Sequence, residues 1–154
     1  MTGKTDSQLQ TLGITLPQAA APAANYVPFV ISGNLLVISG QLPMDAGKLA
    51  VTGRLGAGVT LEQGQQAAKL CAINILAQAK AALGDLDRVT RIVRLGGFVA
   101  SAQDFTDQPQ VINGASNLMV EVFGDLGRHA RAAVGVNVLP LGAAVEVDAI
   151  IEFA

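Results

Sequence analysis

Arg131 and Glu146 are the residues whose types could hold and process a small anionic molecule. Arg131 begins a stretch with strand-like alternation, which places its side chain on the same face as Ala133 and Gly135. These small neighbours leave room for a ligand, and a guanidinium binds a carboxylate through two parallel hydrogen bonds. Glu146 is expected on that same face of the following strand, within reach of a group that Arg131 holds. Alternation alone does not separate this site from an exposed arginine and glutamate on a solvated face.

The single cysteine and the single histidine offer little for nucleophilic catalysis. Cys71 lies on the apolar stripe of a predicted helix, which favours a buried thiol that packs as a small hydrophobic group. His129 lies in a predicted loop without an evident orienting partner, which favours a surface residue over a proton carrier. The GxSxG, phosphate-loop, HExxH, CxxC and dinucleotide-binding motifs are all missing. We therefore expect neither a metal ion nor a cofactor.

The elements that must position these residues follow the order β-β-β-α-β-α-β-β, after a short helix within residues 4–14 and a proline-containing linker. Thr60 and Gln63 predict a capping box at the start of a long helix, which Gly84 ends. A second amphipathic helix is predicted over 108–123. Predicted strands cover residues 26–32, 35–39, 48–53, 88–100, 132–138 and 145–153.

The last two predicted strands alternate strictly and are joined by the turn Leu139–Gly142, which predicts a hairpin. Its apolar face would enter the core, through Val134 and Val136 on one strand and Val147 and Ile151 on the other. Two helices covering one face of a mixed sheet make a two-layer α+β domain. The other face, with Arg131 and the carboxylates, stays uncovered: either it is solvated, or it faces other copies of the chain.

Composition favours the second possibility. Of the 154 residues, 14% are charged and 51% are hydrophobic, with a mean hydropathy of +0.45. Soluble domains have about 25% charged residues, so part of this surface is expected to be buried between subunits. An alanine- and glycine-rich monomer with an unusually neutral surface is the alternative.

Charge and hydropathy also argue against several classes of protein. A net charge of -2 and a pI near 5.2 give no electrostatic footprint for nucleic acid. No apolar run approaches the ~18 residues that a membrane span needs. The first residues, MTGKTDSQLQTLG, lack the apolar segment of a signal peptide. We expect a soluble, cytoplasmic protein.

Three sequence blocks resemble the RidA (YjgF) family, also called endoribonuclease L-PSP. They are Ser39-Gly40-Gln41-Leu42-Pro43, the Asn113-Gly-Ala-Ser block, and His129-Ala-Arg131 through Leu139-Pro140 to Glu146-Val-Asp-Ala-Ile. The resemblance runs from about Tyr26 to Phe153 and is closest to a longer subgroup. It divides the chain into an N-terminal extension, residues 1–25, and a RidA-like domain, residues 26–154.

The resemblance implies a chorismate-mutase-like fold assembled as a homotrimeric barrel with ligand clefts between subunits. It further implies cofactor-free hydrolysis of reactive enamines and imines, such as 2-aminoacrylate, to 2-keto acids and ammonia. The family's carboxylate-binding arginine falls on Arg131, and the acidic residue that holds or activates water falls on Glu146. Other substrate-binding positions fall on Tyr26, Gly40 and Asn113.

One position departs from the deaminase pattern. Ala133 stands where that pattern has a cysteine, and Cys71 cannot replace it because it belongs to a helix. Two other functions therefore stay open beside deamination. One is a non-catalytic protein that binds small carboxylates such as 2-keto acids, and Ala133 favours it somewhat. The other is an endoribonuclease, against which the acidic pI argues.

Overall fold

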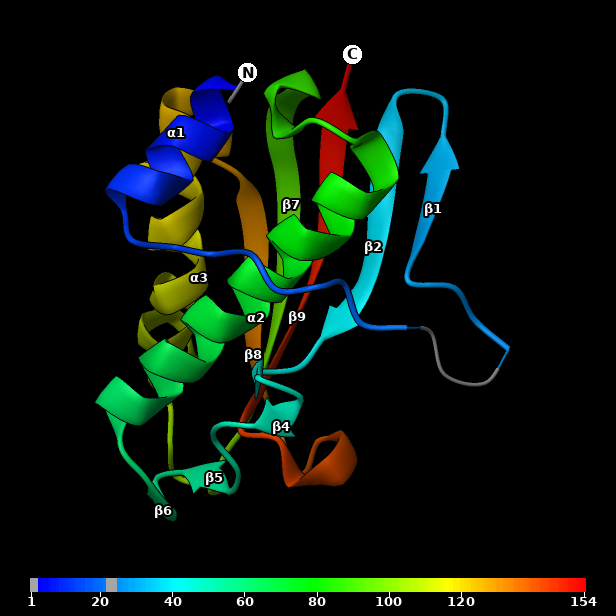
Figure 1. The fold of residues 1–154 in the computed structure, drawn as a ribbon. Coiled ribbons are helices and arrows are strands. Elements are labelled where there is room, and N and C mark those ends of the chain that lie inside the picture. The colour runs from blue at the N-terminus through cyan, green and yellow to red at the C-terminus, as the bar shows by residue number, and fades with distance from the viewer. Residues whose placement is uncertain (1–2, 22–24) are drawn as a thin grey trace.

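A five-stranded mixed sheet forms the centre of the computed structural model, which describes residues 3–21 and 25–154 (Figure 1). Residues 1–2 and 22–24 of the expected N-terminal extension lie outside the described residues. The strand order is β1-β2-β9-β7-β8, and only β7 and β8 run parallel. The bounds are β1 Phe29–Ser32, β2 Leu35–Gln41, β7 Val89–Ala100, β8 Ala130–Val136 and β9 Val145–Phe153.

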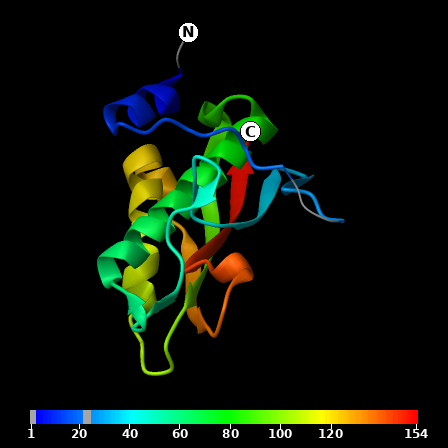
Figure 2. The same ribbon diagram turned by 60° about the horizontal axis from the view of Figure 1, so that its bottom comes forward.

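Two long helices cover one face of this sheet, as predicted (Figures 1 and 2). Helix α2 (Leu61–Leu83) packs on β2 and β9, and α3 (Gln108–Phe123) packs on β7 and β8. The predicted capping box is present, because the Gln63 amide donates to Thr60 Oγ1 at 3.2 Å and the Thr60 amide donates to Gln63 Oε1 at 2.9 Å. The core lies between the helices and the sheet and includes Leu36, Ile38, Ile75, Leu76, Ile92, Leu95, Ile112, Met119 and Ile151.

The predicted hairpin between the last two strands is wrong. β8 pairs with one side of β7, and β9 pairs with the other side, so β7 lies between them. The turn near Pro140–Gly142 is therefore part of a connection that passes β7. Alternation identified both strands correctly, but it carries no information on which strand lies between two others.

The predicted face of β8 is also wrong. Val134 was expected in the core and is 45% exposed on the uncovered face, whereas Val147 and Ile151 are buried as predicted. Arg131 pairs with the fully buried Leu95, so its side chain lies on the helix side of the sheet. β8 is an edge strand, and its neighbour α3 offers polar groups to it; the polar side of β8 therefore faces the helix layer.

Short strands complete the fold at one end of the sheet. β3 (Met44–Asp45) pairs with β4 (Lys48–Leu49), and β5 (Arg54–Leu55) pairs with β6 (Gly58–Val59). The strand predicted over residues 48–53 is thus outside the main sheet. The predicted hairpin through Gly33-Asn34 is confirmed, since Ser32 pairs with Leu35.

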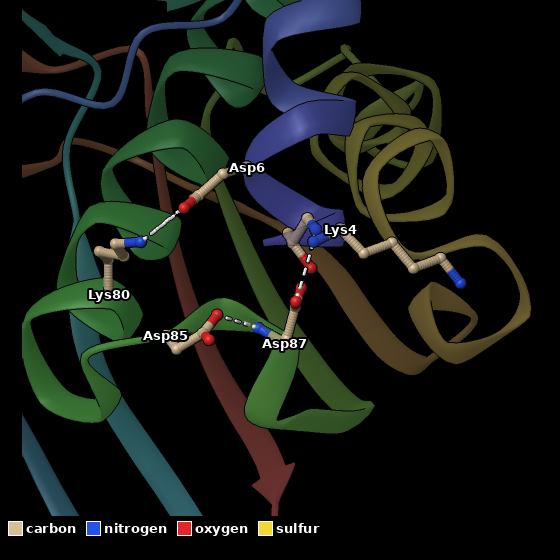
Figure 3. Close-up of polar contacts among 6 residues, drawn as sticks. Lys4, Asp6, Lys80, Asp85 and Asp87 are labelled. Carbon is tan, nitrogen blue, oxygen red and sulfur yellow. Dashed lines mark hydrogen bonds and ion pairs between the residues drawn. The ribbon is translucent and has the colours of Figure 1, made fainter. Parts of the chain in front are cut away.

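Helix α1 (Lys4–Thr11) is attached to the rest of the molecule by acidic side chains (Figure 3). The carboxylate of Asp87 accepts hydrogen bonds from the backbone amides of Lys4 and Thr5 at 2.8 and 2.7 Å. Hydrogen bonding from Thr5, through its side chain first and then through its backbone amide, together with the Lys4 amide, lowers the pKa of Asp87. Asp6 and Lys80 form an ion pair at 3.0 Å.

The segment after α1 runs along α2, where the Gln78 side chain donates to the Ala20 carbonyl at 3.0 Å (Figure 1). Ile14 and Leu16 pack against the core on the way. In the described parts of the chain, no helix combines the length and the apolar character that crossing a membrane requires.

Candidate functional site

Arg131 is held by three acceptors on one face of α3. Its Nη1 donates to Asn113 Oδ1 at 2.8 Å and to Ser116 Oγ at 3.1 Å, and its Nη2 donates to the Pro109 carbonyl at 3.1 Å. A guanidinium has five N–H groups, so Nε–H and one Nη2–H have no partner among the described residues. Those two groups remain to bind a ligand carboxylate. We call Arg131, Asn113, Ser116 and Ala133 the arginine half-site.

Ala133 lies two residues after Arg131 and so shares its side of β8. It is partly buried against the core. Its methyl group supplies no proton donor or nucleophile where the related deaminase pattern has a thiol. The wall beside Arg131 is thus small and apolar.

His129 is engaged by hydrogen bonds, contrary to the expectation of a free surface residue. The half-buried ring approaches Ser116 Oγ through Nε2 at 2.8 Å and the Gly127 carbonyl through Nδ1 at 2.7 Å. Burial lowers the pKa of His129, and the charge of Arg131 lowers it further, against the opposing effect of the Gly127 hydrogen bond. Sequence spacing could have suggested part of this cluster, since Pro109, Asn113 and Ser116 follow each other at helical intervals.

Glu146 lies on the other face of the sheet, beside Gly40 at the end of β2. A Cβ atom at Gly40 would lie only 2.9 Å from Glu146 Cδ. The Glu146 carboxylate can therefore occupy this position because residue 40 has no side chain. Burial raises the pKa of Glu146, and the nearby charge of Asp148 raises it further. The carboxylate accepts no hydrogen bond within residues 3–21 and 25–154.

Tyr26 and Gly40 line one cavity of about 200 Å³. Ala20, Ala21 and Gln78 also line it, so the N-terminal segment contributes to its wall. Tyr26 is 55% exposed and stands at the start of the hairpin that leads to Gly40. We call Tyr26, Gly40 and Glu146 the glutamate half-site.

One chain does not bring the two half-sites together. Glu146 pairs with Phe98, which pairs in turn with Val134, so Glu146 shares the uncovered face with Val134. Arg131 lies on the opposite face and on a strand that β7 separates from β9. The expectation that Arg131 and Glu146 share a face is therefore wrong, because the arginine side of β8 faces α3 and not the uncovered face.

Neither a metal site nor a reactive thiol accompanies these residues. No cluster of three or more histidine, cysteine, aspartate or glutamate side chains suited to a metal ion occurs in the described ranges. Cys71 is fully buried, as predicted, and its thiol lies 3.7 Å from the Val145 carbonyl. Burial raises the pKa of this thiol.

Residues 6–153 match the family described as "YjgF/chorismate mutase-like, putative endoribonuclease". The chain belongs to this family. Among curated relatives, it is similar to Protein TCP17 of Trypanosoma cruzi, with 56% identity over 97% of this chain and 94% of that protein. It is also similar to the RutC family protein y4sK of Sinorhizobium fredii (strain NBRC 101917 / NGR234), with 33% identity over 88% of this chain and 90% of the relative.

Several solved structures have the same fold. The protein Atu1372 of Agrobacterium tumefaciens, of unknown function, is 58% identical with a TM-score of 0.92, covering 97% of this chain and 92% of that one. A "putative endoribonuclease" of Shewanella oneidensis is 38% identical with a TM-score of 0.95, covering 98% and 100%. RidA of an Antarctic Psychrobacter is 26% identical with a TM-score of 0.61, covering 88% and 94%.

Proposed function

We propose that the protein hydrolyses imines and enamines of 2-amino acids to 2-keto acids and ammonia. Arg131 of one copy holds the substrate carboxylate, and Glu146 of a neighbouring copy directs the water. The observation that carries the proposal is the arginine half-site, where α3 fixes the guanidinium and two of its N–H groups stay available. Membership of the YjgF family and the motifs shared with its RidA members support the choice of substrate class.

A site built from two copies accounts for the separation of the half-sites. The uncovered face presents the exposed side chains of Val30, Val37 and Val134, which burial against another copy would remove from water. β8 is an edge strand, so its arginine half-site can lie next to a neighbour's sheet. A closed ring of three copies satisfies every such contact at once, and a homotrimer is the assembly we propose.

The reaction needs only orientation and proton transfer. Arg131 fixes the carboxylate of the imino acid, and the oxygen of a water molecule adds to the carbon of the C=N bond. Glu146 accepts a proton from that water and returns it to the nitrogen. In the resulting carbinolamine, Glu146 takes the hydroxyl proton and passes this second proton to the amino nitrogen. The C–N bond then breaks as the C=O bond forms, which releases ammonia and leaves the 2-keto acid. Burial and the charge of Asp148 raise the pKa of Glu146, which makes its carboxylate a stronger base for accepting a proton from water.

Ala133 favours a second function, the binding of 2-keto acids without turnover. In that case Arg131 holds the same carboxylate, but no imine is hydrolysed faster than in buffer. The endoribonuclease activity in the family description fits this chain less well. A net charge of -2 is a poor basis for contacts with a phosphate backbone.

The decisive experiment mixes two inactive variants. Arg131→Ala lacks the carboxylate contact and Glu146→Gln lacks the base, while each keeps the half-site that the other has lost. If the two halves of a site come from different chains, refolding an equal mixture into random trimers makes about a quarter of the sites wild type in both halves. Keto-acid release from imines generated in situ, compared with the uncatalysed rate, measures the recovery.

Three results are informative. Recovered activity supports both the deaminase function and the shared site. No recovery, with each variant assembled as a trimer by light scattering, contradicts the shared site. A wild-type protein that binds pyruvate but never exceeds the uncatalysed rate contradicts deamination and selects the binding function.

A further inference from the structure

We infer that Ser116 and His129 are positioning residues for Arg131, because a chain of hydrogen bonds runs from the Gly127 carbonyl through the imidazole and the hydroxyl to the guanidinium. This inference rests on the proposed function, in which Arg131 binds a carboxylate. The chain comprises His129 Nδ1 to Gly127 O at 2.7 Å, His129 Nε2 to Ser116 Oγ at 2.8 Å, and Arg131 Nη1 to Ser116 Oγ at 3.1 Å.

The direction of each hydrogen bond follows from its end groups. A carbonyl only accepts, so Nδ1 of His129 must carry the hydrogen that points to Gly127. In the neutral ring Nε2 is then an acceptor, and the hydroxyl of Ser116 donates to it. With its hydrogen used in this way, Ser116 Oγ presents lone pairs, and Arg131 Nη1 donates to one of them. Burial lowers the pKa of His129 and so favours this neutral form.

The start of the chain is anchored by close packing. A Cβ atom at Gly127 would come 2.1 Å from the Met119 carbonyl, so the backbone of Gly127 lies directly against α3. Arg91 of β7 holds the adjoining loop by donating to the carbonyls of Asp125 and Arg128 at 2.9 and 3.2 Å. The carbonyl that orients His129 is thus fixed by α3, which carries Asn113 and Ser116, and by β7, which pairs with the strand of Arg131.

The consequence concerns the ligand-binding N–H groups of Arg131. A free arginine side chain loses rotamer freedom on binding, and a side chain held beforehand loses less. Asn113 and Pro109 fix two points of the guanidinium, and Ser116 adds a third acceptor. Without His129, the Ser116 hydroxyl hydrogen is free to turn to another acceptor, and its lone pairs are no longer committed to Arg131.

The test uses pyruvate as the probe, with its Kd measured by calorimetry and imine hydrolysis measured beside it. We expect Ser116→Ala and His129→Phe each to weaken pyruvate binding about 2- to 12-fold, the range for loss of one hydrogen bond. The KM should rise by the same factor while kcat changes little, because Arg131 still makes its carboxylate contact. His129→Gln should bind almost normally, because its Oε1 can accept from the Ser116 hydroxyl.

A double variant tests whether Ser116 and His129 act through one series of hydrogen bonds. If Ser116 and His129 act through one path, Ser116→Ala combined with His129→Phe should bind pyruvate no more weakly than either single variant. Asn117→Ala is the matched control, since Asn117 is exposed on the same helix next to Ser116.

The outcomes separate this inference from the proposed function. Additive losses in the double variant, or His129→Gln as weak as His129→Phe, overturn the positioning role. Wild-type affinity in Ser116→Ala, combined with weak binding in Arg131→Ala, overturns it as well and leaves the proposed function standing. Wild-type affinity in an assembled Arg131→Ala variant overturns the proposed function and this inference together.

Discussion

The two half-sites differ in how completely one chain satisfies their charged groups. In the arginine half-site, Arg131 makes three hydrogen bonds to α3, and His129 and Ser116 are bound to each other. In the glutamate half-site, the carboxylate of Glu146 receives no hydrogen bond from the described residues, and its closest constraint is the bare backbone of Gly40. In the proposed function, the arginine half-site is thus the preorganised half that binds the carboxylate, and the glutamate half-site is the open half that receives water or a neighbouring chain.

The electrostatic shifts follow the same division. His129 has a lowered pKa and Glu146 a raised one, so burial favours the uncharged form in both half-sites. The permanent charge that remains in the site is that of Arg131. Under the proposed function, a carboxylate substrate would therefore meet a fixed positive charge in one half-site and a group able to take up a proton in the other.

The largest expected effect comes from Glu146→Gln. If the glutamate half-site performs the proton transfer, kcat for imine hydrolysis should fall by about 10²-fold or more, the usual contribution of a general base. The Kd for pyruvate should stay close to the wild-type value. Glu152→Gln is the matched control, because Glu152 lies on the same strand and face but is bonded to Thr90 at 2.7 Å. An unchanged kcat in Glu146→Gln would remove the chemical role from this half.

Arg131→Ala should instead act mainly on binding and weaken the affinity for pyruvate. Loss of a charge-assisted, two-point contact costs about 1.5–3 kcal/mol, or roughly 10- to 150-fold in pyruvate affinity. Arg131→Lys should recover only part of the loss, since an ammonium does not reproduce the guanidinium fork. Arg128→Ala serves as control, because that exposed side chain pairs with the exposed Asp125 and with no other acidic side chain in the part of the chain that the structure describes. Equal affinities for pyruvate in the Arg128 and Arg131 variants would show that the binding half lies elsewhere.

The smallest expected effect is on the free energy of unfolding. Its dependence on pH has opposite signs for His129 beside the arginine half-site and for Glu146 in the glutamate half-site. The pKa of His129 is lowered from 6.5, so the unfolded chain takes up that proton more readily and stability falls as pH decreases below about 6.5. The pKa of Glu146 is raised from 4.5, so the folded chain takes up that proton more readily and stability falls as pH rises above about 4.5.

Melting curves of two variants across pH 4 to 8 check both signs. Relative to wild type, His129→Gln should gain melting temperature as the solution becomes more acidic below pH 6.5. The melting temperature of Glu146→Gln should rise relative to wild type as the pH rises from 4 to 7. Both comparisons are made at one protein concentration. Parallel trends in the two variants would contradict the contrast between the half-sites.

Sequence patterns predicted the local structure well. Thr60 and Gln63 define the start of α2, Gly84 and Gly124 end the two long helices, and the alternation over 145–153 selects the buried side of β9 correctly. Each of these features is decided by residues close together in the chain. For the same reason Cys71, at helical spacing among apolar neighbours, was predicted to be buried, and it is.

The sequence patterns gave wrong predictions where contacts between segments far apart in the chain determine the structure. The alternation of β8 is as regular as that of β9, yet the valine side of β8 faces outward because β8 is an edge strand beside the polar groups of α3. Arg131 finds its partners 15 to 22 residues earlier in the chain. We expected His129 at the surface because its partner Ser116 belongs to α3, and the sequence does not predict the path of the loop between them.

The attachment of α1 has a consequence for the order of folding. A helix of eight residues is too short to persist in isolation, and its first amides are bound by Asp87, more than 80 residues along the chain (Figure 3). It can form only after the turn that carries Asp87 has folded. The same dependence makes α1 the segment that detaches first, so its amide hydrogens should exchange with solvent well before those of α2. Since the segment that follows α1 lines the cavity of Tyr26 and Gly40, this early local opening would change the wall of that cavity while the sheet stays intact.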